Sequence, residues 1–234
     1  MALPCRDVVF ITPDGFCADT AAAVSLARDA LAGGVSIVQI RDRVASFERM
    51  YAVVAAFTSE LGGAARFVVN GSHAVSIAKS IPGIGVHVRE ERIGKDMEAA
   101  CAAVRNGGAR AAVCNGGAVC NGGALVGCSV HSLQTAVQAV RLGPPDYIQV
   151  GTMFETRSHP GKAPEGPELL RRVREAVDPS CSLIGVGGIT ADNATAVMQH
   201  GADGVAVISA ISAAAEPYKA AADIIRKVKV HRHG

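Results

Sequence analysis

The chain has 234 residues and a formal net charge of +2, which is too small to predict a binding surface for nucleic acid or an anionic membrane. Hydrophobic residues make up 49% of it, enough for a large core, and no apolar stretch approaches the roughly 18 residues of a membrane span. The seven cysteines are an odd number without a C-x-x-C pair, so reduced thiols and a cytoplasmic location are expected, with no secretory signal.

Short β-branched runs alternate with Ala-rich helical segments along the chain. The predicted strands are residues 8–12, 35–41, 66–70, 83–88, 125–130, 147–150, 183–186 and 205–208. The predicted helices are residues 20–32, 47–61, 74–80, 97–105, 133–142, 167–177, 193–200 and 217–228. Eight such units in this length predict one α/β domain, residues 1–234, folded as a parallel eight-stranded (β/α)8 TIM barrel. The alternative, an open doubly wound sheet, usually has fewer strands, and no G-x-G-x-x-G follows the first strand.

Two segments lie outside this alternation. The tandem hexamer "AVCNGGAVCNGG" falls within residues 108–124, an insertion that we expect to be flexible and to lie at the end of the barrel opposite the active site. Its two cysteines are six residues apart with no histidine near them, so a duplicated loop is favoured over a metal site. Residues 229–234 are expected to form a solvated basic tail.

Candidate site residues follow from the barrel, because such enzymes carry their active sites at the carboxyl ends of the strands. Ser129 and His131 end the fifth predicted strand, where His131 is either an acid/base group or a polar residue that ends a strand. His87 ends the fourth strand and is either part of the site or a buried core histidine. We expect one of Arg41 and Arg43 to face the mouth and bind an anionic group, and the other to form an ion pair, for example with Glu48.

A phosphate site is predicted after the last two strands. Gly187 and Gly188 follow the seventh strand, and Ser209 and Ala210 follow the eighth. Glycines let the backbone approach a ligand closely, and N–H groups at the start of a short helix bind anions. The alternative is that the glycine pair only makes a tight turn.

Six stretches together resemble the thiamin phosphate synthase/TenI family of barrels, from about residue 8 to residue 220. They are "VSIVQIRDR", "VVNGSHAVSIA", "GVHV", "GCSVHSLQTAV", "DYIQVGTMFETRSHPG" and "IGVGGITADNATAVMQHGADGVAVISAI". The resemblance implies an enzyme of thiamin biosynthesis with one of two activities. The synthase joins hydroxymethylpyrimidine pyrophosphate to thiazole phosphate with Mg²⁺. The TenI-type tautomerase aromatises a carboxythiazole phosphate by proton transfer without a metal.

Departures from the synthase pattern favour the tautomerase. The resemblance places Mg²⁺-binding aspartates of synthases at Gly71 and Arg92, and a lysine of the synthase motif at Arg43. Because Mg²⁺ is held by carboxylate and phosphate oxygen, these changes predict that no metal cofactor is used. Mg²⁺ would be required only for the synthase alternative, in which Glu90 or Glu91 partly replaces the missing aspartates.

Other residues resemble TenI-type proteins directly. "FET" at 154–156 resembles the TenI loop, and the TenI catalytic histidine maps to His131. Imidazole suits a tautomerisation because it accepts and donates protons near neutral pH. The resemblance implies that Glu155 orients His131 or acts as a second acid/base, and that Arg41 and Asn70 bind the substrate carboxylate.

The predicted function is therefore that of an isomerase, a thiazole tautomerase, whose partner is a small phosphorylated thiazole. Ser129, Gly187, Gly188, Ser209 and Ala210 complete the predicted substrate site. One alternative is a transferase, thiamin phosphate synthase. Another is a non-catalytic regulator that binds a thiamin-related phosphate. No nucleic-acid or membrane partner is expected, and an apolar helix face would allow a homodimer or higher oligomer.

Overall fold

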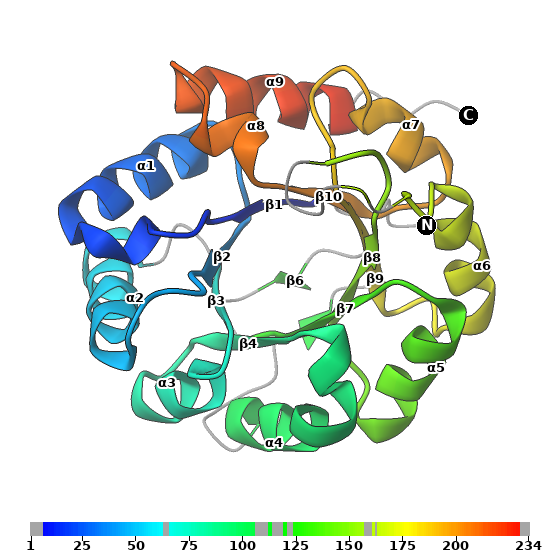
Figure 1. The fold of residues 1–234 in the computed structure, drawn as a ribbon, viewed down its shortest axis with the longest axis horizontal. Coiled ribbons are helices and arrows are strands. Elements are labelled where there is room, and N and C mark those ends of the chain that lie inside the picture. The colour runs from blue at the N-terminus through cyan, green and yellow to red at the C-terminus, as the bar shows by residue number, and fades with distance from the viewer. Residues whose placement is uncertain are drawn as a thin grey trace.

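A closed parallel barrel forms the centre of the molecule. The computed structural model describes residues 7–62, 66–105, 112–113, 119–120, 124–156, 161 and 163–229. The barrel strands are β1 (Asp7–Ile11), β2 (Ile37–Arg41), β3 (Arg66–Asn70), β4 (Gly85–Val88), β7 (Val126–Val130), β8 (Tyr147–Gly151), β9 (Ser182–Val186) and β10 (Gly204–Val207). Strand β1 pairs in parallel with both β2 and β10, which closes the ring (Figure 1). The predicted eight-stranded TIM barrel is confirmed.

Helices surround the barrel on its outside (Figure 1). They are α1 (Thr20–Ala32), α2 (Phe47–Leu61), α3 (Ala74–Ser80), α4 (Ile93–Arg105), α5 (Leu133–Leu142), α6 (Glu168–Ala176), α7 (Ala194–Gln199) and α9 (Pro217–Lys229). Side chains cap several of them; for example, the Asp19 carboxylate accepts from the Ala22 N–H, and the Ser132 hydroxyl accepts from the Thr135 N–H. Helix α4 begins four residues before its predicted start, because Ile93 is buried and extends the apolar face beyond a Gly-Lys-Asp interruption.

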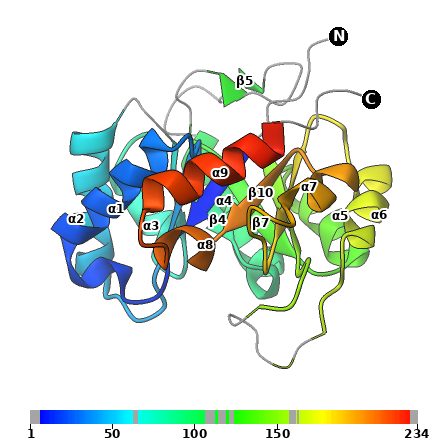
Figure 2. The ribbon, with the colours of Figure 1, turned by 90° about the horizontal axis from the view of Figure 1, so that it is seen from above.

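Three short helices follow strands or loops: η1 (Phe16–Ala18), η2 (Glu90–Arg92) and α8 (Ser209–Ser212). In Figure 2, α8 lies at one end of the barrel. Since α8 follows β10 directly, its end of the barrel is the one where the strands finish. None of the described helices is long and apolar enough to cross a membrane.

Two apolar clusters hold this architecture together. Alternate strand residues point to opposite faces, so Val8 and Phe10 join the layer between sheet and helices, whereas Val9 and Ile11 join the barrel interior. In the outer layer, Phe16 packs edge-on against Phe10 and Phe57, with ring centroids 6.4 and 6.1 Å apart. The few aromatic residues are therefore concentrated beneath α1 and α2.

The insertion contains one short hairpin among its described residues. Strand β5 (Ala112–Val113) pairs antiparallel with β6 (Val119–Cys120). Figure 2 places β5 at the end of the barrel opposite α8, as expected. Apart from the residues of β5 and β6 and Ala124, residues 108–124 lie outside the described residues, so the predicted flexibility is not tested. The predicted basic tail, 229–234, is described only at Lys229, which ends α9.

Gly127 in β7 offers a direct test of barrel packing. A Cβ at this position would lie 2.0 Å from Cζ of Tyr147, whose buried ring leaves no room for it. We expect Gly127→Ala to lower the free energy of unfolding by about 1–3 kcal/mol, as overpacking of a core does. Urea denaturation measures the effect. Gly94→Ala in α4 is the control: its Cβ would meet only Gln138 Nε2, at 3.6 Å, so this variant should be neutral or more stable. Equal losses in both variants would contradict the packing argument.

Candidate active site

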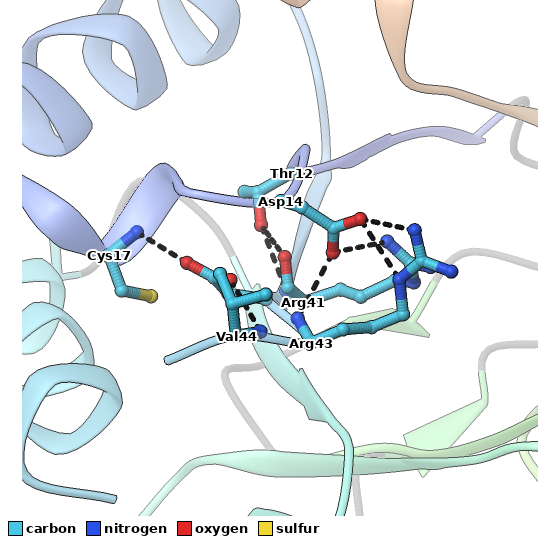
Figure 3. A network of polar contacts seen from close by, with 7 residues as sticks. Thr12, Asp14, Cys17, Arg41, Arg43 and Val44 are labelled. Carbon is cyan, nitrogen blue, oxygen red and sulfur yellow. Dashed lines mark hydrogen bonds and ion pairs between the residues drawn. The ribbon is translucent and has the colours of Figure 1, made fainter. Parts of the chain in front are cut away.

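Asp14, which follows β1, forms ion pairs with two arginines at the barrel mouth (Figure 3). Asp14 Oδ1 lies 3.2 Å from NH1 of Arg41, and Asp14 Oδ2 accepts from Nε of Arg43 at 2.9 Å. The hydrogen bond from Arg43 is the main cause that lowers the pKa of Asp14 to about 2. The expectation that only one arginine forms an ion pair is therefore wrong, because Asp14 reaches both Arg41 at the end of β2 and Arg43 in the bend that follows it.

Arg41 keeps capacity for an anionic ligand despite this ion pair. Its guanidinium has five N–H donors, one NH1 contact is made to Asp14, and 22% of the side chain is exposed. Burial is the main cause that lowers the pKa of Arg41, and the positive charges of Arg43 and Arg89 act in the same direction. An anion bound at Arg41 would offset this repulsion.

Asn70 ends β3 directly beside Arg41. The two residues are paired in register, and Asn70 is paired with His87 on its other side. Asn70 is 6% exposed, and its Oδ1 is a buried atom with no hydrogen-bond partner among the described residues. A buried polar atom without a partner is uncommon and costs free energy, which fits a group kept for binding.

His131 is held by a carboxylate from the neighbouring strand's loop. Glu90 Oε2 lies 2.6 Å from His131 Nδ1, and Glu90 Oε1 accepts from the His131 backbone N–H at 2.9 Å. The Thr135 hydroxyl donates to Glu90 Oε1 at 2.6 Å. Because the carboxylate accepts from Nδ1–H, a neutral ring carries its lone pair on Nε2. The histidine is 26% exposed, so it is accessible at the barrel mouth.

A second histidine lies deeper in the barrel. His87 is 2% exposed, with Nδ1 3.0 Å from the Tyr147 hydroxyl and Nε2 2.6 Å from the Ser129 hydroxyl. Burial lowers the pKa of His87 to about 3, so its ring is neutral at physiological pH. The core interpretation of His87 is therefore correct, but the residue touches Ser129 of the predicted site.

Both backbone conformation and lack of space require glycine at the two positions that follow β9. Gly187 and Gly188 have φ of +102° and +65°. A Cβ on Gly187 would lie 2.4 Å from Thr152 Cγ2, and one on Gly188 would lie 2.4 Å from the Glu155 carbonyl oxygen. Strand β9 pairs with β10, so this turn lies beside the start of α8, where Ser209 and Ala210 N–H groups lack intrahelical acceptors. The geometry supports a tight turn and leaves phosphate binding there as a prediction.

Comparison with known proteins identifies the family. The family described as thiamine monophosphate synthase matches residues 8–211. The chain belongs to the thiamine monophosphate synthase/TenI family. A thiamine-phosphate synthase of Geobacillus kaustophilus is 34% identical over 216 residues, which cover 90% of this chain and 87% of the relative. A second, from Natronomonas pharaonis, is 35% identical over 194 residues, with 80% and 79% coverage.

Solved structures agree with this family assignment. A thiamine phosphate pyrophosphorylase from Pyrococcus furiosus superimposes with a TM-score of 0.71 at 28% identity and covers 96% of each chain. The protein is accordingly an enzyme of thiamine biosynthesis. The relatives' names favour the synthase alternative over the tautomerase.

The positions at which the resemblance places the synthases' magnesium-binding carboxylates hold no carboxylate in this chain. The resemblance places those carboxylates at Gly71 and Arg92, and Arg92 instead forms a two-point ion pair with Asp96, with both N···O distances 2.7 Å. Glu91 pairs with Arg89 at 3.1 Å, and Glu90 is bonded to His131. Within the described ranges, no group of three or more His, Cys, Asp or Glu side chains could hold a metal ion.

Glu90, and not Glu155, is the carboxylate that orients His131, and the role of Glu155 as a second acid/base stays a prediction. The side chain of Glu155 is exposed. The backbone of Glu155 does contact the glycine turn, because its carbonyl oxygen lies in the space that a Cβ on Gly188 would occupy. Sequence reasoning also missed Asp14, although its position just after the first strand is a signal that would have placed it at the mouth.

Gly188 gives a test of the proposed phosphate end of the site. We expect Gly188→Ala to cost about 1–3 kcal/mol of stability, because a non-glycine residue is strained at positive φ and its Cβ would displace the 154–155 loop. Affinity for a phosphorylated thiazole should fall as well. Calorimetry would measure both. Gly83→Ala is the matched control, since Gly83 also has positive φ (+85°) but its Cβ would contact nothing within 4 Å. Unchanged ligand affinity in Gly188→Ala would argue against this phosphate site.

Proposed function

We propose that this member of the family is a thiazole tautomerase, an isomerase that aromatises a carboxythiazole phosphate by acid/base proton transfer without a metal ion. The observation that carries the proposal is the hydrogen-bonded pair of His131 and Glu90 at the carboxyl end of the barrel. A tautomerisation needs one group that removes a proton and returns one at another atom. A histidine whose Nδ1 is bound by a carboxylate has the tautomer and orientation for this task.

In the proposed reaction, Nε2 of His131 takes the proton from the substrate, and Glu90 stabilises the imidazolium that forms. The ring then returns a proton at the second position, which restores the neutral histidine. Arg41, beside Asn70, supports the proposal as a cation for the substrate carboxylate. The turn at Gly187 and Gly188 and the start of α8 offer N–H donors for the phosphate.

A thiamin phosphate synthase is the second candidate, and the relatives' names favour it. It requires a Mg²⁺ site built from residues other than Gly71 and Arg92. Glu90 and Glu91 are the nearby carboxylates after β4, and each already has a partner, His131 and Arg89 respectively. A synthase would therefore have to rearrange these contacts when metal and pyrophosphate bind.

One set of assays separates the candidates. The purified protein would be given the carboxythiazole phosphate tautomer in D₂O with EDTA, and separately hydroxymethylpyrimidine pyrophosphate and thiazole phosphate with Mg²⁺. We expect aromatisation with deuterium incorporation in the first assay. Thiamin phosphate formed only with Mg²⁺ would overturn the proposal in favour of the synthase. Tight binding of the phosphates without turnover in either assay would indicate a regulator. A cytoplasmic location and a homo-oligomeric state remain predictions.

A further inference from the structure

Three side chains form a hydrogen-bonded chain from the barrel interior to its mouth. Tyr147 begins β8 and is 3% exposed, His87 lies in β4 and is 2% exposed, and Ser129 lies in β7 and is half-buried. The Tyr147 hydroxyl lies 3.0 Å from His87 Nδ1, and the Ser129 hydroxyl lies 2.6 Å from His87 Nε2. Gly127 leaves the space in which the Tyr147 ring sits.

The protons of this chain have two possible arrangements. A neutral imidazole has one donor and one acceptor nitrogen. In the first arrangement, Tyr147 donates to Nδ1, Nε2–H donates to Ser129, and the Ser129 hydrogen points elsewhere. In the second, every bond is reversed, so Ser129 donates to Nε2 and the Tyr147 hydrogen needs another acceptor.

The hydrogen-bond partners available to Tyr147 and Ser129 decide between the two proton arrangements. Among the described residues, His87 is the only hydrogen-bond partner of the Tyr147 hydroxyl. The second arrangement would therefore leave a buried O–H donor unsatisfied, which is costly. The first leaves only the Ser129 hydrogen without a protein acceptor, and Ser129 is half-buried at the end of the barrel where a ligand or water can accept it.

We propose that Tyr147 and His87 are positioning residues that fix the Ser129 hydroxyl as a hydrogen-bond donor toward the substrate carboxylate. Strand β3 lies between β2 and β4, and β7 pairs with β4, so Arg41, Asn70 and Ser129 follow one another around one side of the mouth. Removal of a proton next to a carboxylate places negative charge on its oxygens. A donor that is held in place stabilises that charge more in the transition state than in the substrate.

This inference rests on the proposed function for its substrate, but the direction of the chain can be measured without any activity. A long-range ¹H–¹⁵N spectrum of the histidine-labelled full chain would show the tautomer of His87 at neutral pH. We expect a protonated Nε2 and an unprotonated Nδ1. The Nδ1–H tautomer would overturn the proposal, whatever reaction the protein catalyses.

A double-mutant cycle tests whether Tyr147 acts through Ser129. With the carboxythiazole phosphate tautomer as substrate, Ser129→Ala is expected to lower kcat by about 10²-fold, with little change in KM, as loss of an oxyanion donor does. Tyr147→Phe keeps the ring and should lower kcat about tenfold in the native background, yet have no further effect in Ser129→Ala. Tyr218→Phe, on the exposed face of α9, is the control and should change nothing. Additive losses would overturn the positioning role, because a purely structural effect of Tyr147 would persist without Ser129.

Discussion

Replacing His131 with Ala is expected to lower kcat for the thiazole tautomerisation by about 10²–10⁴-fold, the range attributed to a single general acid/base. His131 is the accessible imidazole of the site, and its Nδ1 is bound by Glu90 at 2.6 Å. Because the side chain is 26% exposed, its removal leaves no large cavity and the fold should persist. Steady-state kinetics, with circular dichroism as a check on folding, would measure the loss.

His200→Ala is the matched control for this variant. His200 is exposed at the end of α7, where its Nδ1 contacts the Ala196 carbonyl oxygen at 2.8 Å, so its loss should leave kcat unchanged. If His131→Ala retained more than a third of native turnover, His131 would be a polar residue that ends a strand and the acid/base would have to be sought elsewhere.

The barrel itself was predictable because its signals are local. Each strand is a short apolar run that is buried on both faces, and each helix has its own periodicity and often its own cap, such as Asp19 or Ser132. Counting these units placed Ser129 and His131 at the carboxyl end of β7 before any contact was known. Short segments such as α8 were missed, since four residues carry too little periodicity.

The pairings within the site were not predictable in the same way. Glu90 and His131 are 41 positions apart in the chain, and Asp14 is 29 from Arg43. Such contacts depend on how loops from different strands converge, which neither periodicity nor spacing encodes. The same limit explains why Glu155, and not Glu90, was expected to orient His131.

Glu90→Gln is expected to lower kcat about 10²–10³-fold, by disturbing the tautomer of His131 rather than by removing the histidine. Glu90 accepts three hydrogen bonds, two from His131 and one from Thr135. A Gln has one oxygen and one NH₂ group, so a donor would face either the His131 backbone N–H or Nδ1–H. An NH₂ group that faces Nδ1 favours the tautomer with the proton on Nε2, and in that form Nε2 cannot act as a base. In hydrolases, loss of the carboxylate partner of a catalytic histidine can lower kcat by about 10⁴-fold.

The same variant should also change how stability depends on pH. Burial raises the pKa of Glu90, but the hydrogen bonds from Thr135 and His131 outweigh it and leave the pKa below its ordinary value. A carboxylate whose pKa is lower in the folded state stabilises the fold above its unfolded pKa of about 4.3, and this contribution is lost as pH falls through the folded value. The difference in unfolding free energy between the native protein and Glu90→Gln should therefore be largest near pH 7 and shrink in acid. Urea denaturation near pH 7 and in acid would measure this difference, with Glu155→Gln as the control at an exposed carboxylate. A difference that grew in acid, or an equal kinetic loss in Glu155→Gln, would show that Glu90 is not the carboxylate that holds His131.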